Sequence, residues 1–169
     1  MILETERLLL QPVKIDDAGF ILELYNSPNF IKFVGDRNIK SIEDAKNLIL
    51  EKFLPHYEKH GFGSFLIIKK EEGKKIGNVG IYVREGLDAP DIGFSFLAEF
   101  EGQGYGFEAA MKLMEIAFSE FGLTKISAIT TKENKASQKL IGKLGLQYQS
   151  TVRLPGDDED LFYYEIEKP

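Results

Sequence analysis

Apolar positions along the chain follow two periods, and the change from one to the other separates strands from helices. Strand-like runs bounded by turn residues lie at 6–13, 63–70, 74–85, 91–100, 124–131, 146–152 and 160–167. Helix-like spacing occurs at 15–26, 45–54, 107–121 and 134–145. This order predicts an α/β (α+β) fold with a mixed, mostly antiparallel central sheet of about seven strands and about four flanking helices.

Several residues predict where these elements begin and end. Pro12 is expected to end the first strand, and Ser41 with Asp44 forms a capping pattern before the second helix. Pro55 is expected to kink or end that helix. Residues 27–40 fit neither period and are interpreted as irregular. No repeat, low-complexity tract or linker interrupts the sequence, so residues 1–169 are predicted to form one domain.

The third predicted helix carries its apolar residues three or four positions apart. The pattern assigns one apolar face to the residues Phe107, Ala110, Met111, Met114, Ala117, Phe118 and Phe121. Gly122 and, after the fourth helix, Gly145 stand where C-terminal caps are expected.

Composition excludes several functional classes. The net charge is 21 − 27 = −6, which argues against a nucleic-acid partner. The absence of cysteine removes disulfides, thiolate metal sites and a cysteine nucleophile. No apolar run approaches membrane-spanning length and the start lacks a signal-peptide layout, so a cytoplasmic protein without a membrane partner is expected. His56 and His60 lack a zincin arrangement, and we interpret them as surface residues, with no metal site.

The segment FEGQGYGFEAA, residues 100–110, places Gly102, Gly104 and Gly106 between a strand and a helix. A helix N-terminus offers unpaired N–H groups and partial positive charge, and glycines let the backbone approach an anion closely. A phosphate site is one interpretation of the pattern. A flexible loop without a ligand is the other.

Three segments together carry a resemblance to a known family. They are ETERLLLQPV at the start, DIGFSFLAEFEGQGYGFEAA in the middle and TTKENKASQKLIGKLGLQYQ near the end. In this order they resemble the GCN5-related N-acetyltransferases (GNAT), specifically the ribosomal-protein alanine acetyltransferase-like branch. The resemblance covers nearly the whole chain and implies the GNAT fold with acetyl-CoA as co-substrate.

In that family an amine attacks the acetyl-CoA thioester directly, without a covalent acyl-enzyme. A strand bulge is expected to expose backbone groups, and the resemblance assigns contacts with pantetheine and the thioester carbonyl to Ser95, Phe96 and Leu97. It assigns the pyrophosphate to Gly102, Gln103, Gly104, Tyr105 and Gly106. Asn134 is either a helix N-cap or a pantetheine contact, or both. Ser137 is either a catalytic proton donor to the departing thiolate or a surface serine.

The chain departs from the family pattern at Glu101, where glutamine or arginine is usual. A carboxylate disfavours a nearby pyrophosphate, so Glu101 is expected to point toward solvent, while Gln103 partly substitutes as a donor. The general base is left open. The candidates are Glu99, Asp91, Asp157, Asp158, Glu159 and Asp160, with water as an alternative.

The function predicted on this basis is N-acetyl transfer from acetyl-CoA to a primary amine, either of a small molecule or of a protein N-terminus. One alternative is a non-catalytic acyl-CoA-binding or protein-interaction domain on the same fold, which Glu101 keeps open. Another is a protein whose glycine loop binds no cofactor. The sequence leaves the acceptor undetermined, and it is compatible with a monomer or a homodimer.

Overall fold

A single eight-stranded sheet forms the centre of the computed structural model, which describes all residues from 1 to 169. The strands are β1 (Leu3–Glu4), β2 (Leu8–Pro12), β3 (Ser64–Lys69), β4 (Lys74–Tyr82), β5 (Asp91–Phe96), β6 (Lys125–Thr130), β7 (Gln147–Val152) and β8 (Leu161–Glu167). Their spatial order is β1-β2-β3-β4-β5-β6-β8-β7, and only the β5–β6 pair is parallel. The mixed, mostly antiparallel sheet predicted from the sequence is confirmed, with the two-residue β1 as an additional strand.

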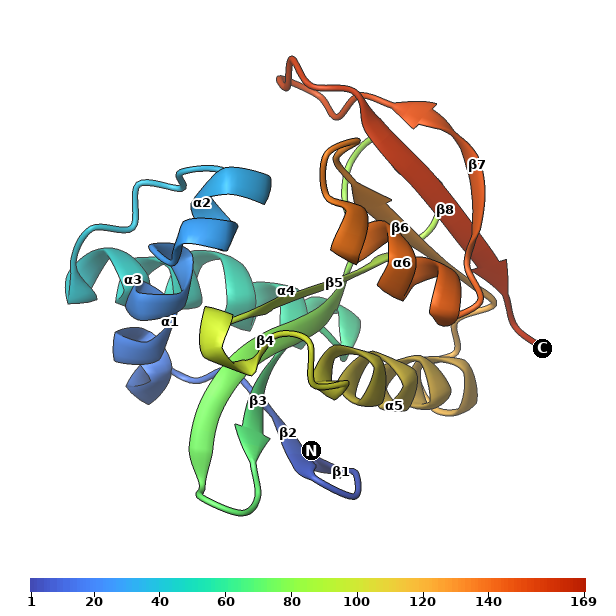
Figure 1. The fold of residues 1–169 in the computed structure, drawn as a ribbon. Coiled ribbons are helices and arrows are strands. Elements are labelled where there is room, and N and C mark those ends of the chain that lie inside the picture. Colours follow the sequence, from blue (N-terminus) through green and yellow to red (C-terminus); the bar gives the residue numbers. More distant parts are fainter.

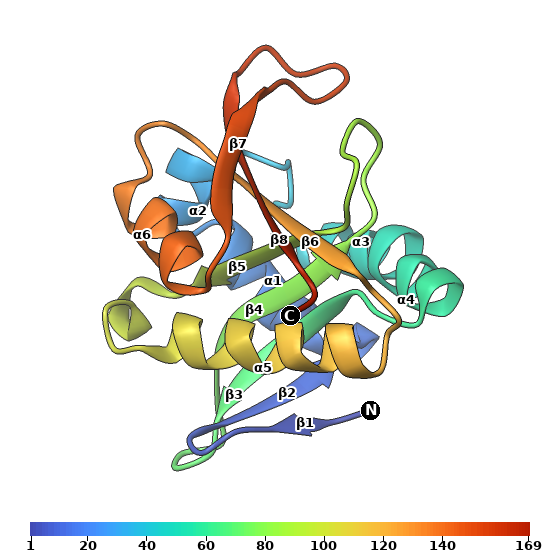
Figure 2. The same ribbon diagram turned by 90° about the vertical axis from the view of Figure 1, so that its right-hand side faces the viewer.

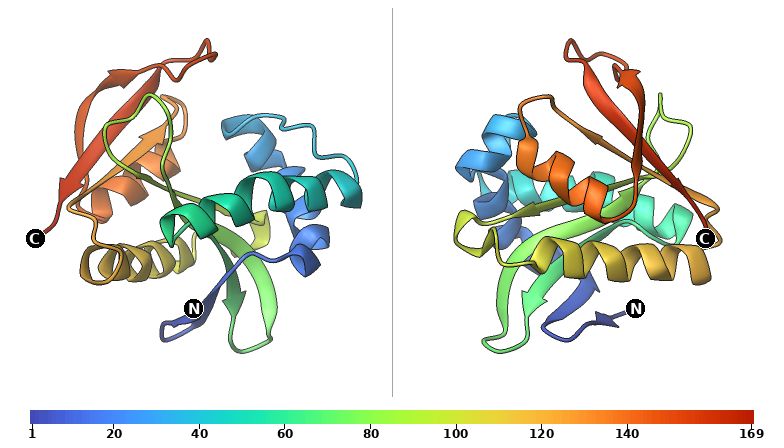
Figure 3. Two further views of the ribbon diagram at one scale, coloured as in Figure 1. Left: turned by 180° about the vertical axis from the view of Figure 1, so that it is seen from behind. Right: turned by 45° about the vertical axis from the view of Figure 1, so that its right-hand side comes forward.

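Six α-helices accompany the sheet: α1 (Ala18–Tyr25), α2 (Pro28–Phe33), α3 (Ile42–Leu48), α4 (Leu54–His60), α5 (Tyr105–Ser119) and α6 (Lys135–Lys143). Two 3-10 turns, η1 (Ile15–Asp17) and η3 (Ala98–Phe100), and one π-helical segment, η2 (Ile49–Phe53), complete the elements. Helix α5 crosses one face of the sheet over β2 and β4 (Figure 2). Helices α3 and α4 lie on the opposite face (Figure 3). No helix combines the length and the apolar character that a membrane span requires.

In the first third of the chain, one expectation was wrong, and one of the two alternatives for Pro55 is excluded. Residues 27–40 contain α2, which begins directly after Ser27 with Pro28 in its first turn, a position where the missing N–H of proline has no helical partner to lose. Pro55 does not end the preceding helix. The chain widens into the π-helical segment η2 and continues as α4, because a wider turn accommodates the proline ring and its missing hydrogen bond.

The face of helix α5 that is buried against the sheet differs from the face that its apolar spacing predicted. Its buried residues are Tyr105, Ala109, Ala110, Leu113, Met114, Ile116 and Ala117, which form part of a core cluster of 33 buried residues. Phe107 and Met111 are instead 37% and 41% exposed. The small side chains of Ala109, Ala110 and Ala117 let the helix lie close to the sheet, so the larger Phe107 and Met111 remain outside this contact.

Strands β5 and β6 separate almost immediately after they meet. Their pairing is limited to Asp91 opposite Ser127, after which the strands diverge (Figure 1). The β4–β5 register continues without interruption from Tyr82–Asp91 to Gly77–Phe96, so the divergence occurs without the expected bulge in β5. The sheet therefore consists of a β1–β5 part and a β6–β8 part that open away from each other.

His56 is not a free surface residue, contrary to the sequence interpretation. The backbone N–H of Val83 donates to its Nε2 at 2.9 Å, so the ring proton is on Nδ1, which donates to the carbonyl of Phe62 at 3.0 Å. The ring also packs edge-on against Phe62 and Tyr82. His56 thus ties α4 to the end of β4 in its neutral form.

This arrangement predicts a pH-dependent stability. Burial lowers the pKa of His56 below its ordinary value of 6.5, against the opposing effect of the bond to Phe62. The unfolded chain therefore binds the proton more readily, and the stabilisation present above about pH 6.5 is lost as the pH falls below that value. We expect the melting temperature to fall more steeply between about pH 7.5 and about pH 5.5 in wild type than in His56→Asn.

His60→Gln is the matched control for this measurement, because His60 lies beside His56 with the ring centroids 4.6 Å apart but forms neither of the two bonds. It should keep the wild-type pH slope. An unchanged slope in His56→Asn would contradict the assignment of the acid-sensitive step to His56.

Candidate active site

A cavity of about 450 Å³ lies where β5 and β6 have separated. Strand β5 contributes one wall, the segment from Phe100 to Phe107 a second, α6 a third and α2 a fourth. Of the ten residues that the resemblance assigns to the site, eight line this cavity. They are Ser95, Phe96, Gly102, Gly104, Tyr105, Gly106, Asn134 and Ser137. Leu97 and Gln103 do not line it.

Successive residues of β5 direct their backbone N–H and C=O groups alternately toward β4 and toward the gap between β5 and β6. The N–H of Leu97 donates to the carbonyl of Ile76 on the β4 side at 3.0 Å. Because antiparallel pairing alternates, Ser95 also directs its backbone groups to β4, whereas Phe94 and Phe96 direct theirs to the side that β6 has left. The free N–H donors of this wall are therefore those of Phe94 and Phe96. Sequence spacing alone did not reveal this alternation.

The three glycines meet different structural requirements. Gly102 and Gly104 have φ angles of +72° and +84°, which only glycine adopts without strain. Gly106 has an ordinary conformation, but a Cβ there would lie 2.9 Å from Cδ2 of Leu140 and 3.4 Å from Phe96. The first two glycines turn the backbone into the helix, and the third lets α6 approach α5.

The turn leaves the start of α5 open. Gly104 is the N-cap residue and has no side chain to cap the helix, and the first helical bond runs from the N–H of Glu108 to the carbonyl of Gly104 at 3.1 Å. The N–H groups of Tyr105, Gly106 and Phe107 thus precede the first helical hydrogen bond. With the dipole of a 15-residue helix behind them, they form a site that favours an anion.

The sequence led us to expect that Glu101 points toward solvent. The side chain is exposed, but its carboxylate is bound by a neighbouring helix. Nδ2 of Asn29 in α2 donates to both carboxylate oxygens of Glu101, at 3.0 and 2.9 Å. Both residues line the cavity, so this contact joins α2 to the glycine loop at the cavity edge. Gln103 folds back within its own loop, and its Nε2 donates to the carbonyl of Glu99 at 2.8 Å.

Asn134 and Ser137 stand at the start of α6. Oδ1 of Asn134 accepts from the N–H of Ser137 at 3.1 Å, which confirms Asn134 as the N-cap. Its Nδ2 is not part of that bond and remains a donor on the cavity wall. The two interpretations of Asn134 are therefore compatible. Ser137 also lines the cavity, and its hydroxyl makes no hydrogen bond within the chain.

An ion-pair cluster anchors the glycine loop from outside the cavity. Glu108 in the first turn of α5 accepts from the hydroxyl of Thr5, from the backbone N–H of Arg7 at 2.9 Å and from its Nε at 2.8 Å. Nη1 of Arg7 donates to the carbonyl of Gln103 at 3.1 Å, and the guanidinium lies 4.3 Å from the ring centroid of Tyr105. Arg7 thus holds both the loop and the helix start.

The charge state of Glu108 follows from these contacts. Burial by itself would raise the pKa of this carboxyl, but the bonds from Thr5 and Arg7 outweigh burial and lower the pKa below its usual value. The carboxylate therefore remains ionised and directed toward the β1–β2 hairpin.

Comparisons with known proteins agree with this architecture. The model of the acetyltransferase (GNAT) domain matches residues 7–147. The uncharacterized N-acetyltransferase YoaA of Bacillus subtilis is 29% identical over 173 residues, which cover 99% of this chain and 97% of that protein. The chain belongs to the GNAT family of acetyltransferases. It is an N-acetyltransferase, and acetyl-CoA is the acetyl donor that the family implies.

Solved GNAT structures show the same fold. The ribosomal-protein-S5-alanine acetyltransferase of Vibrio fischeri aligns with a TM-score of 0.83 and 22% identity over 100% of both chains. RimL, a ribosomal L7/L12 α-N-protein acetyltransferase solved in complex with coenzyme A, aligns with a TM-score of 0.83 and 16% identity over 99% of this chain and 98% of that one. The predicted resemblance to the family and to the fold of this branch is confirmed.

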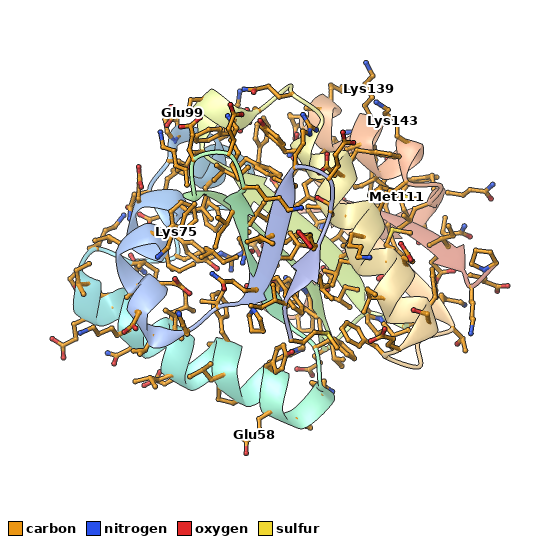
Figure 4. All side chains as sticks on the ribbon, turned by 90° about the horizontal axis from the view of Figure 1, so that it is seen from below. Glu58, Lys75, Glu99, Met111, Lys139 and Lys143 are labelled. Atoms are coloured by element: carbon orange, nitrogen blue, oxygen red, sulfur yellow. The ribbon has the colours of Figure 1, made fainter.

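The proposed bases of this GNAT protein lie away from the cavity. Asp91 is buried at the far end of β5, roughly 17 Å from Phe96 at 3.3 Å per residue, and Nε of Arg84 donates to it at 2.7 Å. Glu99 is exposed on η3 (Figure 4). Asp157 to Asp160 line a separate cleft. Glu101, held by Asn29, is the only carboxylate of the cavity lining.

Some site residues were missed by the sequence reasoning. Helix α2 contributes Asn29, Phe30 and Phe33 to the lining, and the Ser27-Pro28 pair was the available signal for its start. Lys139 and Lys143 of α6 and Phe107 of α5 complete the open edge. Arg7 has no local signal for its role, since its partners are about one hundred positions away along the chain.

The Arg7–Glu108 cluster is expected to support both folding and cofactor binding. Arg7→Ala removes the anchor of the Gln103 carbonyl and leaves the Glu108 carboxylate, 19% exposed, without its cation. We expect a loss of about 1–2 kcal/mol in unfolding free energy and weaker coenzyme A binding, because the glycine loop is no longer pre-organised. Chemical denaturation and calorimetric titration measure the two effects.

A double-mutant cycle with Glu108→Gln isolates the pair, and a coupling energy of about 0.5–1 kcal/mol is expected. Arg153→Ala is the control, because it removes an arginine that pairs with the exposed Asp160 far from the glycine loop. Coenzyme A affinity that is equal in Arg7→Ala and wild type would show that the cluster does not support the cofactor loop.

Proposed function

We propose that this N-acetyltransferase moves the acetyl group of acetyl-CoA to a primary amine by direct attack, without a covalent enzyme intermediate, and that residues 1–169 act as one unit. The observation that carries the proposal is the continuity of one cavity from the separated edge of β5 to the open N-terminus of α5. An extended thioester whose far end is a pyrophosphate matches that combination of strand donors and anion site.

The cavity residues then divide into three roles. The N–H groups of Tyr105, Gly106 and Phe107 hold the pyrophosphate. The N–H groups of Phe94 and Phe96 and the Nδ2 of Asn134 hold the pantetheine amides and polarise the thioester carbonyl. The hydroxyl of Ser137 is the catalytic proton donor to the thiolate.

In the reaction the amine nitrogen forms a bond to the acetyl carbon, the C–S bond breaks and the sulfur leaves with the electron pair. The thiolate takes a proton from Ser137, which is reprotonated from water. The acceptor arrives as an ammonium and first loses one proton, and the free amine that results is the nucleophile. That proton, and the one that the nitrogen loses after the attack, pass to water, because the only lining carboxylate is bound to Asn29 at the cavity edge.

A second cleft supports an acceptor that is a primary amine. It has a volume of about 540 Å³ and is lined by Lys132, Glu133 and the loop from Gly156 to Asp160. Glu133 precedes Asn134, so the cleft adjoins the start of α6. Its lining has five carboxylates and one lysine, and Arg153 pairs with one of the five, Asp160. The excess of carboxylates gives the cleft a negative potential, which attracts an ammonium on a small molecule or a protein N-terminus.

Thiol release tests the proposal directly. Acetyl-CoA is mixed with the protein and a panel of amines that includes peptides with free N-termini, and free coenzyme A is measured over time. We expect release that depends on at least one amine. Coenzyme A binding by calorimetry without release for any amine would instead favour the non-catalytic binding domain.

The acidic cleft provides a second arm of this test. Joint replacement of Asp157, Asp158 and Glu159 by their amides should raise the KM for the accepted amine and leave coenzyme A affinity unchanged, since these residues do not line the cofactor cavity. A KM that stays unchanged for every accepted amine would show that the cleft does not guide the acceptor.

Ser137 and Asn134 are expected to give separable effects. Ser137→Ala should lower kcat by about 100-fold or less, the lower end of general acid catalysis, since a thiolate is already a fair leaving group, while coenzyme A affinity stays near wild type. Asn134→Ala should weaken coenzyme A binding and lose about 1 kcal/mol of stability through the missing cap.

Asn134→Asp separates the two functions of this residue, because aspartate keeps the capping oxygen and loses the Nδ2 donor. It should retain the melting temperature and still bind coenzyme A more weakly. If Ser137→Ala keeps the wild-type kcat when chemistry is rate-limiting, water rather than Ser137 protonates the thiolate.

A further inference from the structure

Two lysines form a cationic edge on the cofactor cavity. Lys139 and Lys143 stand four positions apart on α6, so their side chains emerge from the same face of the helix about one turn from each other. Both are exposed and both line the cavity (Figure 4 shows them projecting from α6 above α5). They are its only cationic lining residues.

Neither ammonium group is neutralised by the protein. No carboxylate lies within ion-pair distance of Lys139 or Lys143, whereas eight other cationic side chains, those of Arg7, Lys40, Lys69, Lys70, Lys75, Arg84, Lys125 and Arg153, have such partners. Glu101, the only carboxylate of the lining, is bound by Asn29 of α2. In a chain of net charge −6, this edge therefore has a local positive potential of its own.

The packing of α6 against α5 places this edge beside the anion site. Cδ2 of Leu140 lies 2.9 Å from the position of a Cβ on Gly106, so the α6 turn that carries Lys139 abuts the first turn of α5. Nζ of Lys143 lies 5.7 Å from the ring centroid of Phe107, whose side chain is 37% exposed and also lines the cavity. An exposed aromatic ring with an ammonium above it is suited to a base and a phosphate.

Coenzyme A carries two kinds of phosphate, the pyrophosphate and the monoester on the ribose 3′ oxygen. The pyrophosphate is matched by the N–H groups at the start of α5, which leaves the two lysines without a partner. We propose that Lys139 and Lys143 bind the ribose 3′-phosphate, so that the enzyme selects the phosphorylated cofactor over 3′-dephospho-coenzyme A. The inference rests on the proposed placement of acetyl-CoA in this cavity.

Under this proposal, tight binding requires a cofactor that carries the 3′-phosphate. Acyl carriers that present only a pantetheine arm, and nucleotides that lack the 3′-phosphate, would leave both ammonium groups unpaired. Discrimination then depends on these two side chains rather than on the glycine loop, because the loop meets the same pyrophosphate in both forms of the cofactor. The anion sites of the loop and of α6 should therefore respond to different substitutions.

Calorimetric titration of the whole chain with coenzyme A and with 3′-dephospho-coenzyme A tests the proposal. Wild type should bind coenzyme A about three- to tenfold more tightly, the range expected of two exposed ion pairs. The Lys139→Gln/Lys143→Gln variant should lose this preference and keep wild-type affinity for the dephospho form. Lys135→Gln, on the same helix but outside the cavity lining, should keep the preference.

Salt provides an independent readout. The preference of wild type should shrink between about 0.05 M and about 0.5 M KCl, because exposed charges are screened over that range, and the affinity of the double variant for the two cofactor forms should remain equal throughout. Circular dichroism and melting temperature confirm that the variants are folded.

The possible failures are distinct. Equal binding of the two forms by wild type overturns this inference and leaves the proposed function intact. An equal loss of affinity for both forms in the double variant also overturns it, since the lysines would then serve the pyrophosphate. Absence of any coenzyme A binding by wild type overturns the proposed function together with the inference.

Discussion

The parting of β5 from β6 is the structural constraint on which the rest of the site depends. A parallel pair that continued along both strands would consume the backbone donors of Phe94 and Phe96 and would close the sheet. Here pairing stops after Asp91 and Ser127, and β6 continues along β8 and β7 as a separate antiparallel unit. The opening exposes strand donors, and the starts of both α5 and α6 face it.

The open edge is stabilised from several sides. Gly106 allows α6 to pack closely on α5, and the Arg7–Glu108 cluster ties the start of α5 to the β1–β2 hairpin. Asn29 joins α2 to the glycine loop through Glu101. Because these contacts come from four different parts of the chain, the cavity geometry depends on the folded state as a whole.

Charge is distributed unevenly around this opening. Carboxylates of Glu133 and of the acidic loop after Val152 lie at the start of α6, whereas Lys139 stands at the middle of the same short helix and Lys143 at its end. Under the proposed function, an ammonium acceptor and a polyanionic cofactor would therefore be drawn to different parts of α6. Such separation would keep the two substrates from competing for one electrostatic site.

Local patterns were sufficient for much of this protein. Residue spacing predicted the strands β3, β4, β5, β7 and β8 and the helices α5 and α6, and the glycines marked the strand-to-helix turn, because each depends on neighbours in the sequence. The same spacing misjudged the orientation of Phe107 and Met111, since it cannot distinguish which apolar residues the sheet covers. It also missed α2, a helix with little apolar periodicity.

Only the tertiary structure decided which groups meet at the site. Arg7 and Glu108 are 101 positions apart, and the contact of Asn29 with Glu101 spans 72. The direction of each N–H along β5 follows from its register with β4, which no local pattern encodes. The sequence by itself determined most of the elements, the family and the position of the glycine turn before α5. The fold determined which backbone N–H groups face the cavity, that Asp91 lies away from the cavity, and that Lys139 and Lys143 have no carboxylate partner, because these properties arise from long-range packing.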